Sequence, residues 1–337
     1  MMKFFKILFF NSMIIGSIIA ISAHSWFTGW IGLEINLLSI LPLLKNHKNS
    51  FPSEATIKYF IVQTLGSSLF LFAVVTQFLL KNPFNELNPP NIVFFSTAML
   101  LKSGAAPFHF WLPEVLSGLS WMNILLIMTW QKLAPMVFLA YQIEKYTLLF
   151  SVIIISSSMI SGFQGLNQTC LRKIMAYSSI NHVSWMISTL LTSTNIFYYY
   201  FIIYMIINMN IIIILNKYNI FFLNQLANIF TQKKMIKFLF ITNFLSLGGL
   251  PPFLGFFPKW LTINNMVINS HYTLTSILII FTLISLFFYL RIAFSSLTLL
   301  SSESLIIIFN KKYYMHFTTN LFTLMGLVSC SFTDSFI

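Results

Sequence analysis

The chain has 337 residues, of which 57% are hydrophobic and 8% are charged, and its mean hydropathy is +0.83. A soluble core does not need so much apolar surface, so the composition excludes a soluble domain and favours membrane-spanning segments. The net charge of +12 comes from basic residues that form no single patch, and this spread argues against nucleic-acid binding.

About eleven apolar stretches follow one another along the chain, each long enough for a membrane span of roughly 20 residues. We therefore expect an all-α polytopic membrane protein of about eleven transmembrane helices. The first stretch is expected to be a retained helix rather than a cleaved signal peptide, because no small-residue cleavage site follows it. The predicted spans cover residues 3–22, 24–44, 56–80, 91–119, 121–142, 147–165, 170–192, 195–216, 237–268, 272–292 and 317–333.

The basic residues of the connections gather on one side of the predicted membrane. That side holds thirteen of them, and the opposite side holds only Lys81 and Lys145. By the positive-inside rule, the N-terminus lies in the cytoplasm or organelle matrix, and an odd number of helices puts the C-terminus on the other side. The thirteen are Lys3, Lys6, Lys45, Lys48, Arg172, Lys173, Lys217, Lys233, Lys234, Lys237, Arg291, Lys311 and Lys312.

Four charged residues stand alone inside apolar stretches: Glu34, Lys102, Lys132 and Lys259. Placing one charge at the centre of a bilayer costs at least about 2.5 kcal/mol, so such residues usually mark a path for ions or protons. A purely structural network of buried ion pairs is the alternative, although a single acid cannot neutralise three lysines. Lys58 follows Glu54 at the start of its span, where a long side chain can reach the interface, so a structural role is the favoured interpretation and Lys58 is only a secondary candidate for the path.

Two histidines, His109 and His182, also fall inside spans. Each is either a hydrogen-bonded packing residue or a proton relay between lysines, and a haem held by axial histidines is a third alternative. The two cysteines, Cys170 and Cys330, are far apart and belong to no metal-binding motif, and the sequence contains no glycine-rich phosphate loop. We therefore expect neither a cofactor nor a metal in this chain.

Two long stretches contain the same pattern, G-x-x-P-F-x-x-x-x-P followed by a charge. The copies begin 145 residues and five predicted helices apart, so the second enters the membrane from the opposite face. Such pairs are typical of inverted repeats, whose broken helices meet at a transport site, while simple proline kinks are the alternative. We expect inverted halves of about 1–142 and 147–292, followed by a C-terminal loop and last helix in 293–337. The helix breaks are predicted at Gly104, Pro107, Gly249, Pro251 and Pro252.

The first copy belongs to a longer motif, KSGAAPFHFWLPE at residues 102–114, that resembles the signature of the antiporter-like subunits of respiratory complex I. Other motifs are similar to the subunit 2 branch of that family and occur in the expected order: GLEIN at 32–36 with LP at 41–42, WQKLAP at 130–135, AYSSINH at 176–182 and GLPPF at 249–253. The length also fits the shortened animal form, and the region after Tyr289 carries no such motif.

The resemblance implies a core membrane-arm subunit of NADH:ubiquinone reductase, which moves protons across the mitochondrial inner membrane. It implies that other subunits oxidise NADH and reduce ubiquinone, and that the neighbours are the small subunit 4L and the antiporter-like subunit 4. The resemblance also implies a role for each buried charge. Glu34 would face the small subunit, and Lys102 would be the titrating lysine. Lys132 would be the connecting lysine and Lys259 the exit-side lysine, with His109 and His182 as polar links.

The expected coupling is electrostatic, because an ionised Glu34 beside Lys102 favours the ammonium form. When the carboxylate is drawn away, the proton leaves Lys102 through water and Lys132 toward Lys259. A stand-alone cation/proton antiporter is the alternative function, but such carriers usually contain an intramembrane acid pair, and Glu34 is the only acid in the middle of a span. A scaffold subunit and a receptor are further classes, and a receptor would need longer extramembrane loops.

Overall fold

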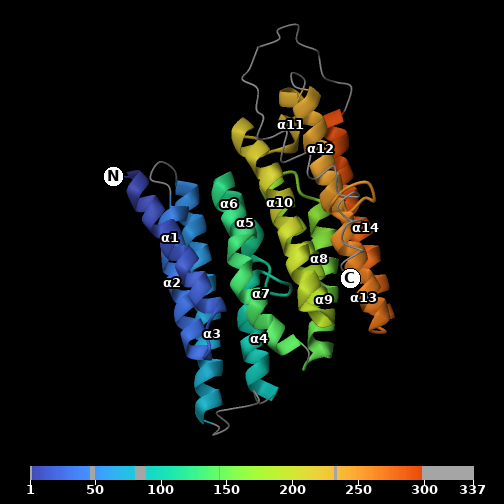
Figure 1. Cartoon of the computed structure of the whole chain (residues 1–337). Helices are drawn as coiled ribbons and strands as arrows, with labels where there is room; N and C mark the ends of the chain where they lie inside the picture. Colours follow the sequence, from blue (N-terminus) through green and yellow to red (C-terminus); the bar gives the residue numbers. More distant parts are fainter. Residues whose placement is uncertain (1, 46–49, 80–88, 144, 231–233, 298–337) are drawn as a thin grey trace. The chain divides into compact units, whose positions relative to one another are not determined.

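The computed structural model describes residues 2–45, 50–79, 89–143, 145–230 and 234–297. The regular elements in these ranges are all α-helices, as predicted, and seven segments are long and apolar enough to cross a membrane. The chain divides into two compact units, Met1–Phe150 and Ser151–Ile337, which Figure 1 colours from blue to green and from green to orange.

Within its described residues, the first unit contains seven helices and the first turn of an eighth. They are α1 (Met2–Ile21), α2 (Trp26–Leu44), α3 (Ser50–Leu79), α4 (Pro89–Ser103), α5 (Trp111–Gly118), α6 (Trp121–Met128) and α7 (Trp130–Ile143). α1 packs along α2, α3 packs against α2, α4 and α5, and α7 packs against α1, α4 and α6. Aromatic rings join four of these helices, because Phe95 lies 4.7 Å from both Trp26 and Phe70 and 6.2 Å from Phe138 between ring centroids.

Small residues allow the backbones of α1 and α2 to approach each other. A Cβ atom on Gly32 would lie 2.5 Å from the backbone nitrogen of Ala20, and one on Gly16 would lie 2.8 Å from that of Asn36. Gly16 and Ala20 are four residues apart on one face of α1, which is the small-xxx-small spacing of closely packed membrane helices. Lipid tails are as apolar as the helix surfaces, so the hydrophobic effect does not drive helices together in a membrane. Van der Waals contact between these closely packed backbones therefore supplies much of the attraction between α1 and α2.

The described part of the second unit continues with α8 (Thr147–Leu166), α9 (Leu171–Thr192), α10 (Thr194–Tyr218), α11 (Leu223–Phe230), α12 (Lys234–Gly248), α13 (Phe256–Ile268) and α14 (Tyr272–Leu297). α9 packs against α10, α13 and α14, while α12 packs along α14 and also contacts α10, α11 and α13. Arg291 of α14 donates two hydrogen bonds of 2.6 Å to carbonyls at the C-terminal end of α8 and beyond it, which otherwise lack helical partners.

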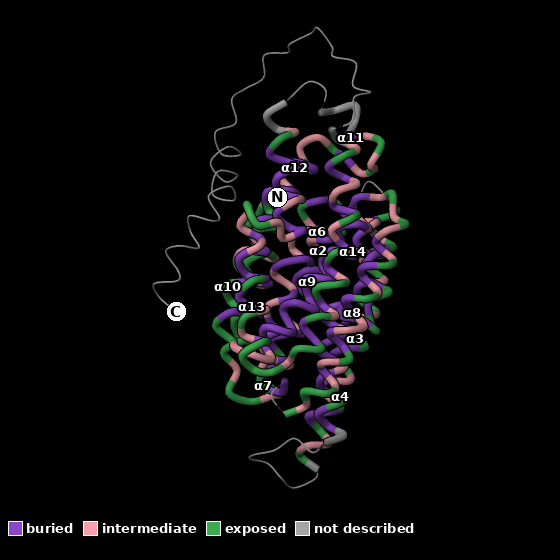
Figure 2. Tube along the Cα trace, turned by 90° about the vertical axis from the view of Figure 1, so that its right-hand side faces the viewer, coloured by how far each residue is buried: buried purple, intermediate pink, exposed green. Residues whose placement is uncertain are grey.

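α9 is the most polar of the long helices, and nevertheless 18 of its 22 residues are buried (Figure 2). Its hydroxyl side chains donate to carbonyls of the preceding turn, as Ser178 does to Met175 at 2.7 Å and Ser184 does to Asn181 at 2.6 Å. These bonds satisfy polar groups within the helix, so α9 can be enclosed by protein. A helix enclosed in this way does not need the hydropathy of a lipid-facing span.

The stretches 91–119 and 237–268, inside which helix breaks are predicted, each contain two helices, and the first of each pair is a short apolar helix, 91–103 and 237–248. The predicted spans and the helices differ in other places. The predicted span 170–192 is α9, which is outside the seven apolar segments because of its hydroxyl-rich sequence. α11 was not predicted, since eight residues of mixed polarity give a weak signal. The span at 317–333 lies outside the described residues, so the count of eleven stays a prediction.

Candidate functional site

The two copies of the repeated motif end their first helix in the same way. α4 ends before Gly104, which has φ 75°, and α12 ends before Gly249, which has φ 81°. In each copy the glycine N–H and the following N–H both donate to one carbonyl, that of Leu100 at 2.9 and 3.1 Å and that of Leu245 at 3.1 and 3.4 Å. This is a C-terminal cap whose left-handed residue is glycine because a side chain is strained there.

The next helix of each copy also begins at the same place, seven residues after the glycine. α5 starts at Trp111 and α13 starts at Phe256. The predicted break residues Pro107, Pro251 and Pro252 are exposed and lie in the connections between the paired helices. The two motif copies therefore share the helix ends and the length of the connection; whether each pair crosses the membrane as one broken helix stays a prediction.

Lys259 of α13 lies against the end of α12. Its side chain is buried, and its Nζ atom donates to the carbonyls of Leu247 at 3.1 Å and Gly248 at 3.0 Å. A Cβ atom on Gly249 would lie 2.8 Å from the Cδ atom of Lys259, so the absence of a side chain there makes room for the lysine. The ammonium group thus interacts with unpaired carbonyls at the negative end of a helix dipole, where a cation is favoured.

Lys102 belongs to the last turn of α4 and is also buried. Its aliphatic stem lies beside Gly66 of α3, where an added Cβ atom would be 3.1 Å from the Cγ atom of Lys102. The residue lines a cavity of about 20 Å³, which is enough for one water molecule. The other lining residues are Leu33, Asn36, Leu37, Tyr59, Gln63, Gln131 and Pro135.

Polar side chains from three other helices line this cavity, and each of them makes a hydrogen bond there. Gln131 of α7 donates to the side-chain oxygen of Asn36 of α2 at 2.7 Å and accepts from Tyr59 of α3 at 3.4 Å. Gln63 of α3 donates to the carbonyl of Lys102 at 3.4 Å. The motif analysis did not select these four residues, although Asn36 and Gln131 lie in the GLEIN and WQKLAP motifs beside the predicted charges.

Glu34 and Lys132 belong to the same unit as Lys102. Glu34 is half-buried on α2, and its carboxylate attracts the ammonium of Lys102 electrostatically without forming a contact ion pair. Lys132 is 1% exposed on α7 and follows Gln131 directly. Pro135 lies inside α7 and cannot donate to the carbonyl of Gln131, so one helical hydrogen bond is missing next to Lys132. The predicted span 121–142 is interrupted at Thr129, between α6 and α7.

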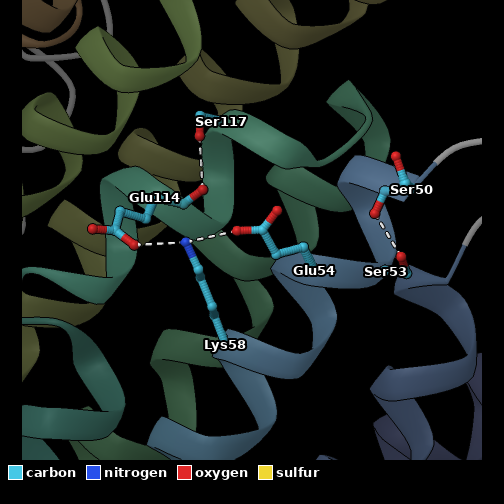
Figure 3. Close-up of polar contacts among 6 residues, drawn as sticks. All are labelled: Ser50, Ser53, Glu54, Lys58, Glu114 and Ser117. Carbon is cyan, nitrogen blue, oxygen red and sulfur yellow. Dashed lines mark hydrogen bonds and ion pairs between the residues drawn. The ribbon is translucent and has the colours of Figure 1, made fainter.

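Lys58 forms a cluster of charges with two glutamates (Figure 3). Its Nζ atom lies 3.0 Å from Glu54 of the preceding helical turn and 3.0 Å from Glu114 of α5. The Lys58 side chain is 43% exposed, and both acids are more exposed than that. This geometry favours the structural interpretation of Lys58 over a place in a buried path, and Glu114 is the partner that sequence spacing did not reveal.

The two histidines have different surroundings. His109 is buried after the α4 cap, with Nδ1 3.2 Å from the carbonyl of Pro107 and its ring 4.2 Å from that of Phe110. His182 is buried on α9, and its Nδ1 lies 2.9 Å from the hydroxyl of Tyr200. Both contacts fit packing residues as well as relays, so the relay role stays a prediction. The described residues contain no group of three potential metal ligands.

The sequence matches the protein family described as NADH:quinone oxidoreductase/Mrp antiporter, TM, over residues 23–285. It is 45% identical over 300 residues to NADH-ubiquinone oxidoreductase chain 2 of Locusta migratoria, a match that covers 89% of this chain and 87% of the relative. The chain belongs to the NADH-ubiquinone oxidoreductase chain 2 family. The chain 2 protein of Anopheles gambiae is 43% identical, with 88% and 86% of the two chains covered. This membership confirms the resemblance inferred from the motifs.

Solved structures show how widely the fold of the chain 2 family is shared. Respiratory complex I from Thermus thermophilus with bound aureothin matches with a TM-score of 0.85 at 21% identity, over 97% of this chain and 78% of that chain. The Mrp complex from Dietzia matches with a TM-score of 0.78 at 14% identity, over 93% and 73%. At these identities the likeness concerns the fold alone.

Proposed function

We propose that the chain is a core membrane-arm subunit of respiratory complex I and contributes to proton translocation coupled to electron transfer from NADH to ubiquinone. The observation that carries this proposal is a set of three lysines, none more than 6% exposed, in the apolar helices of a chain 2 family member. Buried lysines exchange protons readily, since burial penalises their charged form. Electron transfer takes place on other subunits, and this chain needs no cofactor of its own.

The proton path in this proposal uses Glu34, Lys102, Lys132 and Lys259. The Glu34 carboxylate stabilises the ammonium of Lys102, and withdrawal of that carboxylate releases a proton toward Lys132. The water-sized cavity and the neighbouring amides of Asn36 and Gln131 support this step, because a proton needs polar groups or water to cross between helices. His109 and His182 serve as polar links.

The proposed topology has eleven transmembrane helices in the mitochondrial inner membrane, with the N-terminus in the matrix and the C-terminus in the intermembrane space. Two inverted halves each contain a broken helix, which the shared glycine caps and the equal seven-residue spacing support. The neighbours are other membrane-arm subunits, in particular the small subunit 4L and the antiporter-like subunit 4.

Glu34→Gln and Lys102→Ala test this function in the assembled complex. Both changes are expected to lower NADH-driven proton pumping and ubiquinone reduction by about tenfold or more, because each removes one partner of the proposed charge pair. NADH oxidation by an artificial electron acceptor stays unchanged, since electrons enter on other subunits. Normal pumping by an assembled Lys102→Ala complex would exclude Lys102 from the path.

A stand-alone cation/proton antiporter is the second candidate, favoured only by the fold shared with the Mrp complex. Vesicles that contain this chain without other subunits distinguish the two functions. A complex I subunit is expected to give no proton movement when a sodium gradient is applied, whereas an antiporter acidifies or alkalises the vesicle interior.

A further inference from the structure

At one end of the first unit α1 begins, α2 ends, and α3 and α6 begin (Figure 1). Residues from these helix ends line two cavities. Both are lined by Lys45, the residue that follows α2. The first cavity has a volume of about 200 Å³ and also contains Lys6, Ser120 and Asn123 in its lining. The second has a volume of about 490 Å³ and is lined mostly by apolar side chains.

The smaller cavity has the chemistry of an anion site. Lys6 and Lys45 line it, and Ser120 at the N-terminal end of α6 makes no capping hydrogen bond with its hydroxyl. Backbone N–H groups of the first helical turn lack intrahelical acceptors and carry partial positive charge, which adds to the two ammonium groups. The side-chain amide of Asn123 donates to two carbonyls at the end of α2, at 3.2 and 3.4 Å, and so binds the partial negative charge of that helix end.

No carboxylate neutralises these two lysines in the part of the chain that the structure describes. The ion pairs there join Lys58 to Glu54 and Glu114, so the acids of α3 and α5 already have a cationic partner. Lys6 and Lys45 are exposed and lie at the ends of apolar helices. An uncompensated basic pair at this position attracts an anionic group at the lipid–water interface.

The larger cavity continues from Lys45 along the apolar surfaces of three helices. Its lining comes from α1 (Phe5), α2 (Leu41 and Pro42) and α3 (Thr56, Ile57 and Phe60). Ile57 is 59% exposed and Phe5 is 53% exposed, so the groove opens to the outside of the unit. An apolar groove that leads away from a basic cavity matches the layout of a phospholipid, whose acyl chains extend from a charged headgroup.

We propose that this end of α1, α2, α3 and α6 binds an anionic phospholipid, with the headgroup phosphate between Lys6 and Lys45 and one acyl chain in the groove beside Ile57. The site requires only that the chain spans a membrane, and it does not depend on the proton path. The bound lipid would supply the acidic partner that the described residues do not provide here.

Photolabelling of the intact complex tests the site. The complex is placed in phosphatidylcholine vesicles that contain a trace of phosphatidylglycerol with a photoreactive acyl chain, and labelled peptides are identified by mass spectrometry. Label is expected on α1 near Phe5 and on α3 near Phe60. Each lysine at an anionic lipid surface contributes a factor of roughly five, so K6Q/K45Q is expected to reduce the labelling about thirtyfold. Lys145→Gln, a change in an exposed lysine elsewhere in the unit, leaves it unchanged.

A phosphatidylcholine probe with the same acyl chain separates headgroup recognition from simple contact with lipid, and it needs no variant that has to assemble. Weaker labelling by this probe supports the proposal, whereas equal labelling by both probes overturns it. A lipid site should keep the phosphatidylglycerol probe in the presence of about 50-fold excess inorganic phosphate. Displacement of the probe by the phosphate would reveal a site for free anions instead and would overturn the proposal. Absence of label in the intact complex would mean that another subunit covers the groove, and this result also overturns the proposal.

Discussion

Lys102 and Lys259 occupy related places in the two motif copies but reach them by different routes. Lys102 is part of the last turn of α4, whereas Lys259 follows its motif and reaches back to the last turn of α12. One of the two carbonyls that it contacts belongs to Leu247, the residue that aligns with Lys102 when the two glycines are superimposed. Each lysine is thus associated with the C-terminal end of the first helix of its copy, Lys102 as a residue of its last turn and Lys259 through its hydrogen bonds.

Gly249→Ala is expected to displace Lys259, because the new Cβ atom would lie 2.8 Å from its Cδ atom and alanine is strained at φ 81° by about 1–2 kcal/mol. Proton pumping in the assembled complex should fall several-fold. Gly248→Ala is the matched control, since its Cβ atom would meet other side chains at 3.6 Å or more. Equal pumping by the two variants would show that the position of Lys259 does not matter.

Lys132 tests the difference between a proton relay and a fixed cation. Lys132→Arg keeps a charge that is not released in the working range, since the pKa of arginine lies far above that range, and Lys132→Met keeps an unbranched side chain without charge. A relay predicts that both variants assemble and that both pump poorly. A structural cation predicts instead that the arginine variant works nearly normally and the methionine variant assembles badly. Complex yield and pumping rate, measured on the same membranes, separate these results.

At the scale of the helices, close packing in this protein depends on where glycine stands. Gly66 leaves space on α3 for the stem of Lys102, and Gly32 lets α2 approach the backbone of α1. The two positions act differently, since the first accommodates a buried lysine side chain and the second brings two backbones together. A substitution at the second position therefore acts on assembly rather than on the site.

Gly32→Ala is expected to separate α1 from α2, because its Cβ atom would lie 2.5 Å from a backbone atom that cannot rotate away. Overpacking of this kind typically costs about 1–3 kcal/mol, so the amount of assembled complex should fall. Gly162→Ala is the control, because it gains the same helix propensity and its Cβ atom would be 3.5 Å from the nearest side-chain atom. Unchanged complex yield for Gly32→Ala would contradict the packing argument.

At the scale of the whole molecule, the distribution of lysines predicts which ends of the helices face the matrix. Lys145 and Asn167 flank α8, so they report the direction of one helix. With Cys170 and Cys330 replaced by serine, a membrane-impermeant maleimide should label Lys145→Cys from the intermembrane space and Asn167→Cys only from the matrix side. The opposite pattern would reverse the proposed topology.

The sequence by itself determined the features that depend on neighbouring residues. Apolar runs identified most of the helices, because burial in lipid requires a continuous hydrophobic segment. The two repeated glycines identified the ends of α4 and α12, since a left-handed cap is a local backbone property. The buried positions of Lys102, Lys132 and Lys259 followed from their isolation in apolar segments.

Only the tertiary structure decided which groups meet across helices. It joined Lys58 to Glu114, 56 residues away, and Gln131 to Asn36, 95 residues away. It also enclosed α9, whose polar sequence did not show whether lipid or protein surrounds it. The physical reason is that hydropathy and backbone preference act between neighbours in the chain, whereas ion pairs, amide contacts and shared cavities depend on the rotation and packing of separate helices.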